Sequence, residues 1–210
     1  MKKTIIFLGL VSLMFHIACT HTATVRPNLD VTATIANPLN LSVGLYIPPE
    51  VKGLQMSDRA DWADKYIFKV GDAVSSVIYK ALARVFRKVE LLETYPTEAM
   101  IAERGLDFVS TATITEANAA LQSQQGFFTV DATGNIQISA NLTFSDSKLI
   151  QFSSVQATGT GMGNQGVDMF STGKKEFGAP VEVAIRNLGN NIVQQVYGNY
   201  DIRKRADAKQ

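Results

Sequence analysis

Two stretches of the chain repeat hydrophobic residues at the three- and four-residue spacing of an amphipathic helix. They predict one helix over residues 72–86 and another over residues 181–197, which Gly198 would end. The stripe expected to be buried is Val74, Val77, Ile78, Ala81, Leu82 and Val85 in the first helix, and Val181, Ala184, Ile185, Leu188, Ile192, Val193 and Val196 in the second. Each helix therefore has one face to bury against another layer.

Other segments alternate hydrophobic and polar residues with the period of two that is typical of strands. These segments cover residues 41–47, 89–92, 106–116, 119–121, 127–130, 136–144 and 149–160. We expect turns at 133–135 and 146–147. Thr97 is expected to cap a short helix that Gly105 ends.

This order of strand, helix, meander and helix predicts an α+β fold. We expect a mainly antiparallel sheet with the two amphipathic helices packed on one face. One domain would cover residues 41–198, followed by a charged tail over residues 199–210. A tether over residues 19–40, rich in Thr, Asn and Pro, would precede the domain, and part of it, such as residues 31–35, could instead add an edge strand.

The N-terminus has the pattern of a secretory signal. Lys2 and Lys3 precede an apolar run over residues 5–15, and the small residue Ala18 precedes Cys19, the only cysteine of the chain. An ordinary signal peptide or a single anchor helix are the alternatives, but the apolar run is short for a membrane span.

The pattern resembles a bacterial lipoprotein signal, although His16 stands where a leucine-like residue is usual. The resemblance implies that residues 1–18 are removed and that Cys19 becomes the acylated first residue, with palmitate-type chains as its covalent lipid. Thr20 follows the cysteine where an aspartate would favour the inner membrane. The resemblance therefore implies an outer-membrane anchor that faces the periplasm.

Composition limits the chemistry that the mature chain can carry. Without residues 1–18, which include Lys2 and Lys3, the remaining 192 residues hold 18 basic and 19 acidic residues, a net charge of −1, so we expect no nucleic-acid partner. Beyond His21 there is neither histidine nor cysteine, which excludes a Ser-His-Asp or Cys-His apparatus and the usual zinc ligands from the body. We expect no cofactor, no metal and no enzymatic activity, although chemistry based on carboxylates, lysine, tyrosine or serine stays formally open.

Two motifs invite a ligand interpretation that their context does not favour. Gly159, Gly161 and Gly163 resemble a phosphate-binding loop, but no helix start or G-K-S/T sequence follows them, so we interpret them as a flexible loop before the last helix. Asp58, Asp61 and Asp64 would share one face of a helix, but they lack the glycine turn and the terminal glutamate of a calcium loop.

Aromatic and basic residues supply the candidate contact sites. Trp62, with Tyr66 and Phe68 after it, and the adjacent Phe127 and Phe128 are either core or exposed contacts for a partner. A basic patch of Lys80, Arg84, Arg87 and Lys88 is either a solvated helix end or a contact for anionic headgroups or an acidic partner; Arg203, Lys204 and Arg205 offer a second, weaker one.

With Cys19 and this element order, the chain resembles small Gram-negative envelope lipoproteins, such as YajG-like lipoproteins and the auxiliary lipoproteins of lipid-transport ABC systems. The resemblance implies a non-enzymatic accessory or structural subunit of an envelope assembly, with a protein partner or a second copy docking on a strand edge or an aromatic patch. A lipid or amphiphile carrier is the alternative, and it predicts a large apolar pocket. A carboxylate-based glycan hydrolase is a third class that no spacing supports.

Overall fold

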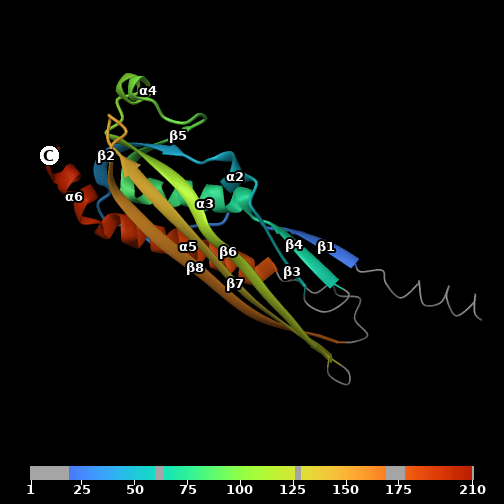
Figure 1. Ribbon diagram of the computed structural model, residues 1–210. Helices are drawn as coiled ribbons and strands as arrows, with labels where there is room; N and C mark the ends of the chain where they lie inside the picture. Colours follow the sequence, from blue (N-terminus) through green and yellow to red (C-terminus); the bar gives the residue numbers. More distant parts are fainter. Residues whose placement is uncertain (1–18, 60–63, 126–128, 169–177, 210) are drawn as a thin grey trace, which may run out of the picture.

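The computed structural model describes residues 19–59, 64–125, 129–168 and 178–209. Strands and helices form two sheets with helices packed on them, and the predicted α+β class is confirmed. The body is elongated, with strand β1 (Cys19–Thr24) at one end and the short helix α4 (Glu98–Glu103) at the other (Figure 1).

The larger sheet has five strands in the order β5-β2-β6-β7-β8. They are β5 (Phe86–Leu92), β2 (Leu39–Tyr46), β6 (Phe108–Gln125), β7 (Thr129–Ser145) and β8 (Gln151–Asp168). The last three are antiparallel and have 17 or 18 residues each. At about 3.3 Å per residue they are roughly 55–60 Å long, so the meander sets the length of the body.

One of the two turns predicted in the meander is correct and the other is wrong. Asp146 makes the turn before β8, since its Oδ1 accepts hydrogen bonds from the amides of Lys148 (2.9 Å) and Ile150 (3.0 Å). Residues 133–135 are not a turn: Gly134 pairs with Leu121 inside the β6–β7 ladder. A strand can pass through a Thr-Gly-Asn sequence when neighbours on both sides supply its ladder partners.

The flank of this sheet is parallel, because β2 pairs in parallel with both β5 and β6. The chain reaches β5 from β2 through α2 (Pro49–Lys52), the second sheet and helix α3 (Gly71–Val85). That second sheet has the order β1-β4-β3, with β3 (Gln55–Arg59) and β4 (Asp64–Lys69) antiparallel and β1 parallel to β4. The sequence pattern did not predict this small sheet.

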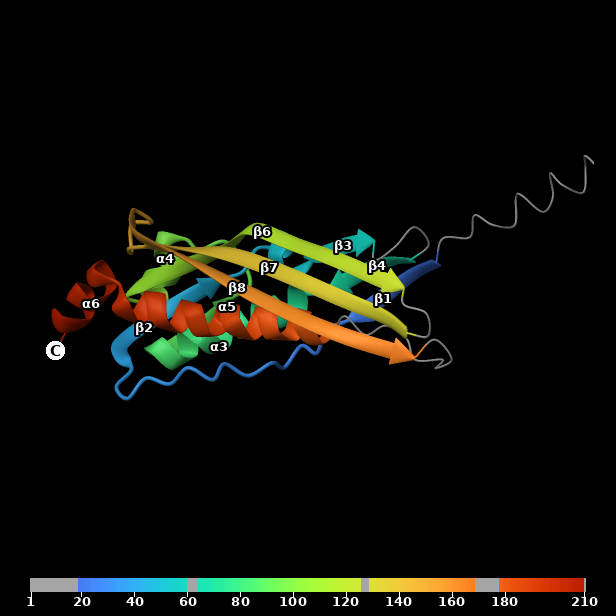
Figure 2. The same cartoon turned by 90° about the horizontal axis from the view of Figure 1, so that it is seen from below.

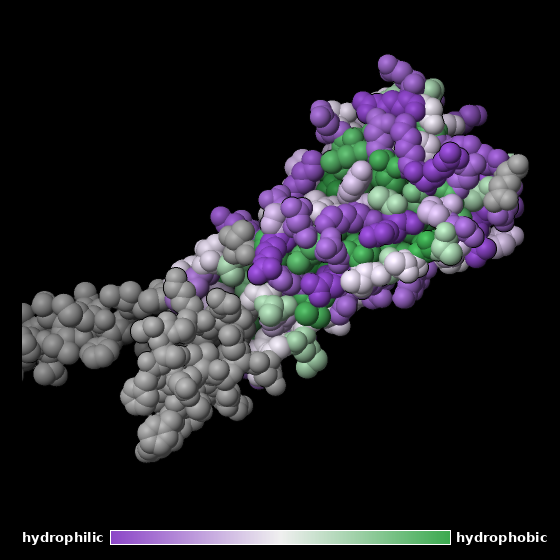
Figure 3. All heavy atoms as spheres, turned by 180° about the vertical axis from the view of Figure 1, so that it is seen from behind, coloured by the Kyte–Doolittle hydropathy of each residue, from purple (hydrophilic) through white to green (hydrophobic). Residues whose placement is uncertain are grey.

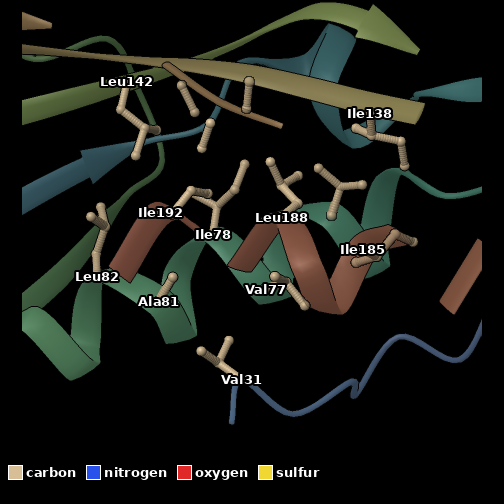
Figure 4. Close-up of a cluster of buried hydrophobic side chains, with 14 of the residues drawn as sticks. Val31, Val77, Ile78, Ala81, Leu82, Ile138, Leu142, Ile185, Leu188 and Ile192 are labelled. Carbon is tan, nitrogen blue, oxygen red and sulfur yellow. The ribbon is translucent and has the colours of Figure 1, made fainter. Parts of the chain in front are cut away.

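Helices α3 and α5 (Gly178–Gly198) lie side by side against the larger sheet (Figure 2). All the stripe residues expected from the helical spacing are buried, so both predicted stripes are confirmed. Figure 4 shows Ile78, Leu188 and Ile192 between the helices and the sheet, facing Ile138 and Leu142 of β7. The core thus joins the two amphipathic helices to the inner face of the meander.

A smaller core lies on the outer face of the same sheet, under α4. It contains Leu92, Ile101, Leu106 and Val109. Thr97 caps α4 as predicted, accepting a hydrogen bond from the amide of Met100. Gly105 follows the helix with a φ of 61°, the left-handed conformation that favours glycine at a helix end.

The segment expected to be a tether, residues 19–40, packs on the body instead. After β1, residues 25–35 run along the side of α3 and α5 that faces away from the sheet, where Val31 lies beneath both helices (Figure 4). Val25, Leu29 and Val31 are at most 5% exposed. Three apolar residues at suitable spacing were enough to bury a segment whose polar composition suggested a linker.

The tail expected over residues 199–210 is mostly a helix, α6 (Tyr200–Asp207). Asn199 caps it, and Ile202 and Ala206 are buried against the core. Lys209 pairs with Asp107, and the Arg205 guanidinium lies 3.8 Å from the centre of the Phe152 ring. Charged residues of the predicted tail therefore bind this helix to the body.

Candidate functional site

The candidate lipid attachment residue, Cys19, is the first residue of β1. Its backbone pairs with that of Asp64 in β4, and the parallel register continues to the pair of Thr24 and Lys69. The signal predicted over residues 1–18 lies outside the described residues. Cys19 is the first described residue, and β1 lies at the end of the body opposite α4 (Figure 1).

The acidic triplet does not form the helical face that its spacing suggested. Asp58 lies in β3 and Asp64 lies in β4, while Asp61 is outside the described residues. The Asp58 carboxylate accepts a hydrogen bond of 2.7 Å from the amide of Leu121. That amide belongs to the part of β6 that extends beyond β2, so Asp58 satisfies an edge group that has no strand partner.

The basic patch takes part in contacts within the protein. Lys80 donates to the carbonyl of Leu29 (2.9 Å), and Arg87 donates to Asn40 (3.0 Å). Arg84 is exposed on α3. Two of the four cations therefore hold residues 29–40 in place, which a pattern of charges along the sequence does not reveal.

Lys88, the fourth cation of the patch, belongs to an ion-pair network on β5. It lies 3.5 Å from Glu90, which also accepts a hydrogen bond from Arg104 after α4. The Arg104 hydrogen bond, together with the charges of Arg104 and Lys88, lowers the pKa of the Glu90 carboxyl below its ordinary value. The network joins the edge strand β5 to the end of α4.

The three glycines form no loop and no phosphate site. Gly159, Gly161 and Gly163 lie in β8, and their α-carbons face helix α5. A Cβ atom at Gly159 would lie 2.0 Å from the Ala184 carbonyl oxygen, and one at Gly161 would lie 2.0 Å from that of Pro180. The interpretation as a flexible loop is therefore wrong: the missing side chains let a helix pack directly on a strand.

The aromatic contact candidates Trp62, Phe127 and Phe128 lie outside the described residues. Tyr66 and Phe68, which follow Trp62 in the sequence, are buried in β4. The rings of Tyr66 and His21 stack with their centres 5.0 Å apart, which links β4 to β1. Tyr66 and Phe68 therefore belong to the core at the β1 end of the body.

The outer face of the meander is a broad polar surface, which we call the polar sheet face. Between the part covered by α4 and the β1 end, its described side chains are mostly hydroxyls and amides, with a single carboxylate, that of Glu116, and the apolar side chains of Ala120 and the exposed Met162. The residues are Thr113, Glu116, Asn118, Asn135, Gln137, Ser139, Asn141, Thr143, Ser154, Gln156, Thr158 and Thr160. Within each strand, Thr, Asn and Gln recur at alternate positions. This pattern could have predicted the polar face from the sequence.

Glu116 organises the centre of this face. A register shift after Ile114 brings Glu116 opposite Ser139, so the carboxylate lies among neutral donors. It accepts hydrogen bonds from Gln137 Nε2 (2.6 Å) and Asn118 Nδ2 (2.7 Å). Its charge is therefore already solvated by the protein before any partner binds.

Two cavities among the described residues lie beside α6. One of about 290 Å³ is lined by Leu41, Asp107, Phe108, Arg205, Ala208 and Lys209. Another of about 410 Å³ is lined by Gly198, Tyr200, Arg203, Lys204 and Asp207. Both have charged walls, which suit neither an acyl chain nor a buried apolar ligand.

Within the described part of the chain, no three histidine, cysteine, aspartate or glutamate side chains gather as a metal site requires. Among the helices described, none is both long and apolar enough to cross a membrane. Seen from behind, the described surface shows hydrophobic patches separated by hydrophilic residues (Figure 3). The exposed large apolar residues include Tyr95, Ile150, Met162 and Tyr200, none of which the sequence singled out.

Comparison with known proteins gives only remote likenesses. No protein-family model and no curated protein matches the chain. Matching solved structures include a neuraminyllactose-binding hemagglutinin homologue from Helicobacter pylori, with 7% sequence identity, covering 89% of this chain and 98% of its own, at a TM-score of 0.44. Another is the protein CT253 from Chlamydia trachomatis, with 12% identity, coverage of 75% and 96%, and a TM-score of 0.42.

A third is a minor lipoprotein from Acinetobacter baumannii, with 8% identity, coverage of 82% and 96%, and a TM-score of 0.32. One of the three is thus named as a lipoprotein, and none identifies a YajG-like protein. Likenesses this remote assign no function to the chain.

Proposed function

We propose that this protein is a lipoprotein of the outer membrane, anchored through acyl chains on Cys19 and facing the periplasm. In this proposal it catalyses no reaction and binds no cofactor. It acts as an accessory or structural subunit of a cell-envelope assembly, and it holds a partner protein at a defined place relative to the membrane.

The observation that carries the proposal is that the described chain packs on the body from Cys19 onward, with no free linker between Cys19 and residue 35. β1 begins at Cys19, and residues 25–35 continue along α3 and α5. An acylated Cys19 would hold one end of an elongated body at the bilayer, with α4 and α6 at the opposite end (Figure 2). A body held in this way suits the positioning of a partner.

The filled interface between sheet and helices favours a docking subunit over a lipid carrier. Side chains such as Ile78, Ile138 and Leu188 are fully buried there. The α5 backbone leaves no room for even a methyl group at Gly159. An acyl chain would have to separate α5 from β8, at the cost of the close contacts that now hold them together.

For the partner we propose the polar sheet face as the contact surface and a protein with an uncharged polar surface as its occupant. Binding to protein surfaces is easier where few charges must lose water, and interface cores are depleted in Lys, Glu and Asp. The described part of this face has one carboxylate, and its neighbours already donate to it. A neutral partner would meet amides and hydroxyls held in place by the ladder.

The anchor is tested by comparing the wild-type chain with Cys19→Ser for acyl labelling and membrane fractionation. We expect the variant to lose the label and to move to the soluble fraction, with an unchanged circular dichroism spectrum. A Thr20→Ser chain serves as the matched control and should keep both the label and the membrane location. A Cys19→Ser chain that stays in the membrane would overturn the anchor.

The docking role is tested by mild extraction of the tagged protein and mass spectrometry of what accompanies it. We expect a partner in fixed ratio that is lost when Gln156 and Thr160 are both replaced by Lys, because buried ammonium groups on a neutral face are costly. Gln195→Lys, on the exposed side of α5, is the matched control. Bound lipid without a protein would favour the carrier instead.

A further inference from the structure

The segment that follows β1 is held by a different kind of contact from the rest of the body. Residues 25–35, which we call the strap, form no helix and no strand. Their three buried side chains, Val25, Leu29 and Val31, lie against the helices, while most of the residues between them are exposed. The strap is thus a third layer, which adds three side chains to the core from the side of the helices that faces away from the sheet.

Side chains of α3 and α5 form hydrogen bonds with the strap backbone. Asn190 Oδ1 accepts hydrogen bonds from the amides of Thr32 and Ala33, both at 2.9 Å. Lys80 Nζ donates to the carbonyl of Leu29 at 2.9 Å. Two residues, one on each helix, therefore satisfy backbone groups that would otherwise need a neighbouring strand.

The seat of the strap is shaped for an apolar side chain. Gly189 of α5 faces Val31. A Cβ atom at Gly189 would be 2.9 Å from Val31 Cγ2 and 2.4 Å from Val77 Cγ1. The strap also makes two ion pairs at the surface, Arg26 with Glu182 at 3.7 Å and Asp30 with Lys80 at 3.3 Å. Exposed pairs of this kind add little to stability.

Release of the strap would expose Val25, Leu29 and Val31, which belong to the main hydrophobic cluster, but it would leave the contacts between the helices and the sheet in place. The inner faces of α3 and α5 bury their stripes against the sheet, on the side away from the strap (Figure 4). Among the described strands, β1 pairs with β4 alone, through six residue pairs, so β1 is an edge strand, whereas the strap has no ladder. Segments with few buried contacts and no ladder of their own open at a lower free energy than the core.

We propose that residues 19–35 are a releasable latch that sets how far the body stands from the membrane. With the strap seated, the body is held next to the anchored Cys19. With the strap and β1 released, the twenty residues 19–38 become a tether with a mean span of about 25 Å and a maximum of roughly 70 Å. This inference rests on the proposed anchor at Cys19 and deepens it by making the reach of the subunit adjustable.

Opening of the strap is measured by thermolysin, which cuts before bulky apolar residues and reaches Leu29 or Val31 only when they leave their seat. In the full chain purified in detergent, we expect the first cuts within the strap while the body stays whole. Asn190→Ala should raise the rate of these cuts about tenfold or more, because two backbone amides lose their acceptor. Gln194→Ala, one turn further along α5 and exposed, should leave the rate unchanged.

A disulfide between Thr32→Cys and Asn190→Cys gives the opposite perturbation, since Thr32 Oγ1 and Asn190 Oδ1 are 3.2 Å apart. It should suppress cleavage within the strap, and reductant should restore it. Cuts spread over the whole chain, at a rate that neither change affects, would show that the strap opens only when the protein unfolds. That result would overturn the latch.

The reach is measured separately, as the thickness of the protein layer on a supported bilayer by neutron reflectometry. Asn190→Ala should thicken or blur the layer by about 20 Å or more, and the disulfide should keep it thin. Faster cleavage with an unchanged layer would overturn the link between strap and reach. If no layer forms at all, the anchor itself is wrong, while the cleavage rates still decide whether the strap opens.

Discussion

The close packing of α5 on β8 makes Gly159→Ala the sharpest test of the fold. A Cβ atom at this position would lie 2.0 Å from the Ala184 carbonyl oxygen, 2.4 Å from the Leu188 amide nitrogen and 2.7 Å from Leu188 Cβ. Two of these three atoms belong to the backbone of a helix, so no rotamer change relieves the contact. The helix must move away from the strand by about 1.5 Å to reach an ordinary separation.

We expect this change to lower the free energy of unfolding by about 3 kcal/mol, the upper part of the range for overpacked cores. Replacing glycine also restricts the unfolded chain, which returns about 0.4–1 kcal/mol. For a chain of this size the net loss corresponds to a fall in Tm of roughly 4–10 °C. The measurement is thermal and urea unfolding of the Cys19→Ser chain, followed by circular dichroism.

Gly198→Ala is the matched control. It lies at the end of the same helix, and a Cβ atom there would meet nothing within 4 Å. We expect its Tm to be equal to or slightly above that of the parent chain. If Gly159→Ala unfolds within about 1 °C of Gly198→Ala, residues around Gly159 do not pack on α5 and the argument for a filled interface fails.

Three further predictions concern local contacts. Thr97→Ala removes the cap of α4 and should cost about 1 kcal/mol in urea unfolding, whereas Thr97→Ser should cost much less; equal losses would contradict the cap. Asp58→Ala leaves the amide of Leu121 without its acceptor and should lower the free energy of unfolding by about 1–3 kcal/mol. Asp58→Asn keeps an acceptor oxygen at this position and should recover most of that loss. Arg104 lowers the pKa of Glu90, so the pair stabilises the fold at pH values above the ordinary pKa of 4.5, and this stabilisation is lost as the pH falls through the acid range below 4.5. Glu90→Gln should therefore flatten the dependence of Tm on pH in that acid range. An unchanged slope would refute the pair.

The helices could be predicted from the sequence because their signal is local. A stripe such as Val74, Val77 and Ile78 buries itself in any fold that offers the helix one apolar neighbour, so spacing alone sufficed. The caps of α4 and the turn at Asp146 are local in the same sense. Each depends on atoms only a few residues apart in the chain.

The candidate site was much harder to predict. Gly159 and Gly161 were predicted to lie in a loop. Only the position of α5 shows that glycine is required there, because any side chain would clash with the helix. Lys80 read as a surface charge because its acceptor, the Leu29 carbonyl, is 51 residues away in the sequence. In each case the decisive partner is distant in the chain, and a pattern of neighbours holds no record of it.

The two buried helical stripes, the alternating strands of the meander and the pattern that points to Cys19 could all be predicted from residue order, since each follows from residues a short distance apart in the chain. Three features appear only in the folded protein: residues 25–35 are a strap, residues 200–207 are a docked helix, and Glu116 lies at the centre of a polar face. Burial of a weakly patterned segment depends on the surface it meets. That surface exists only after the helices and the sheet have come together.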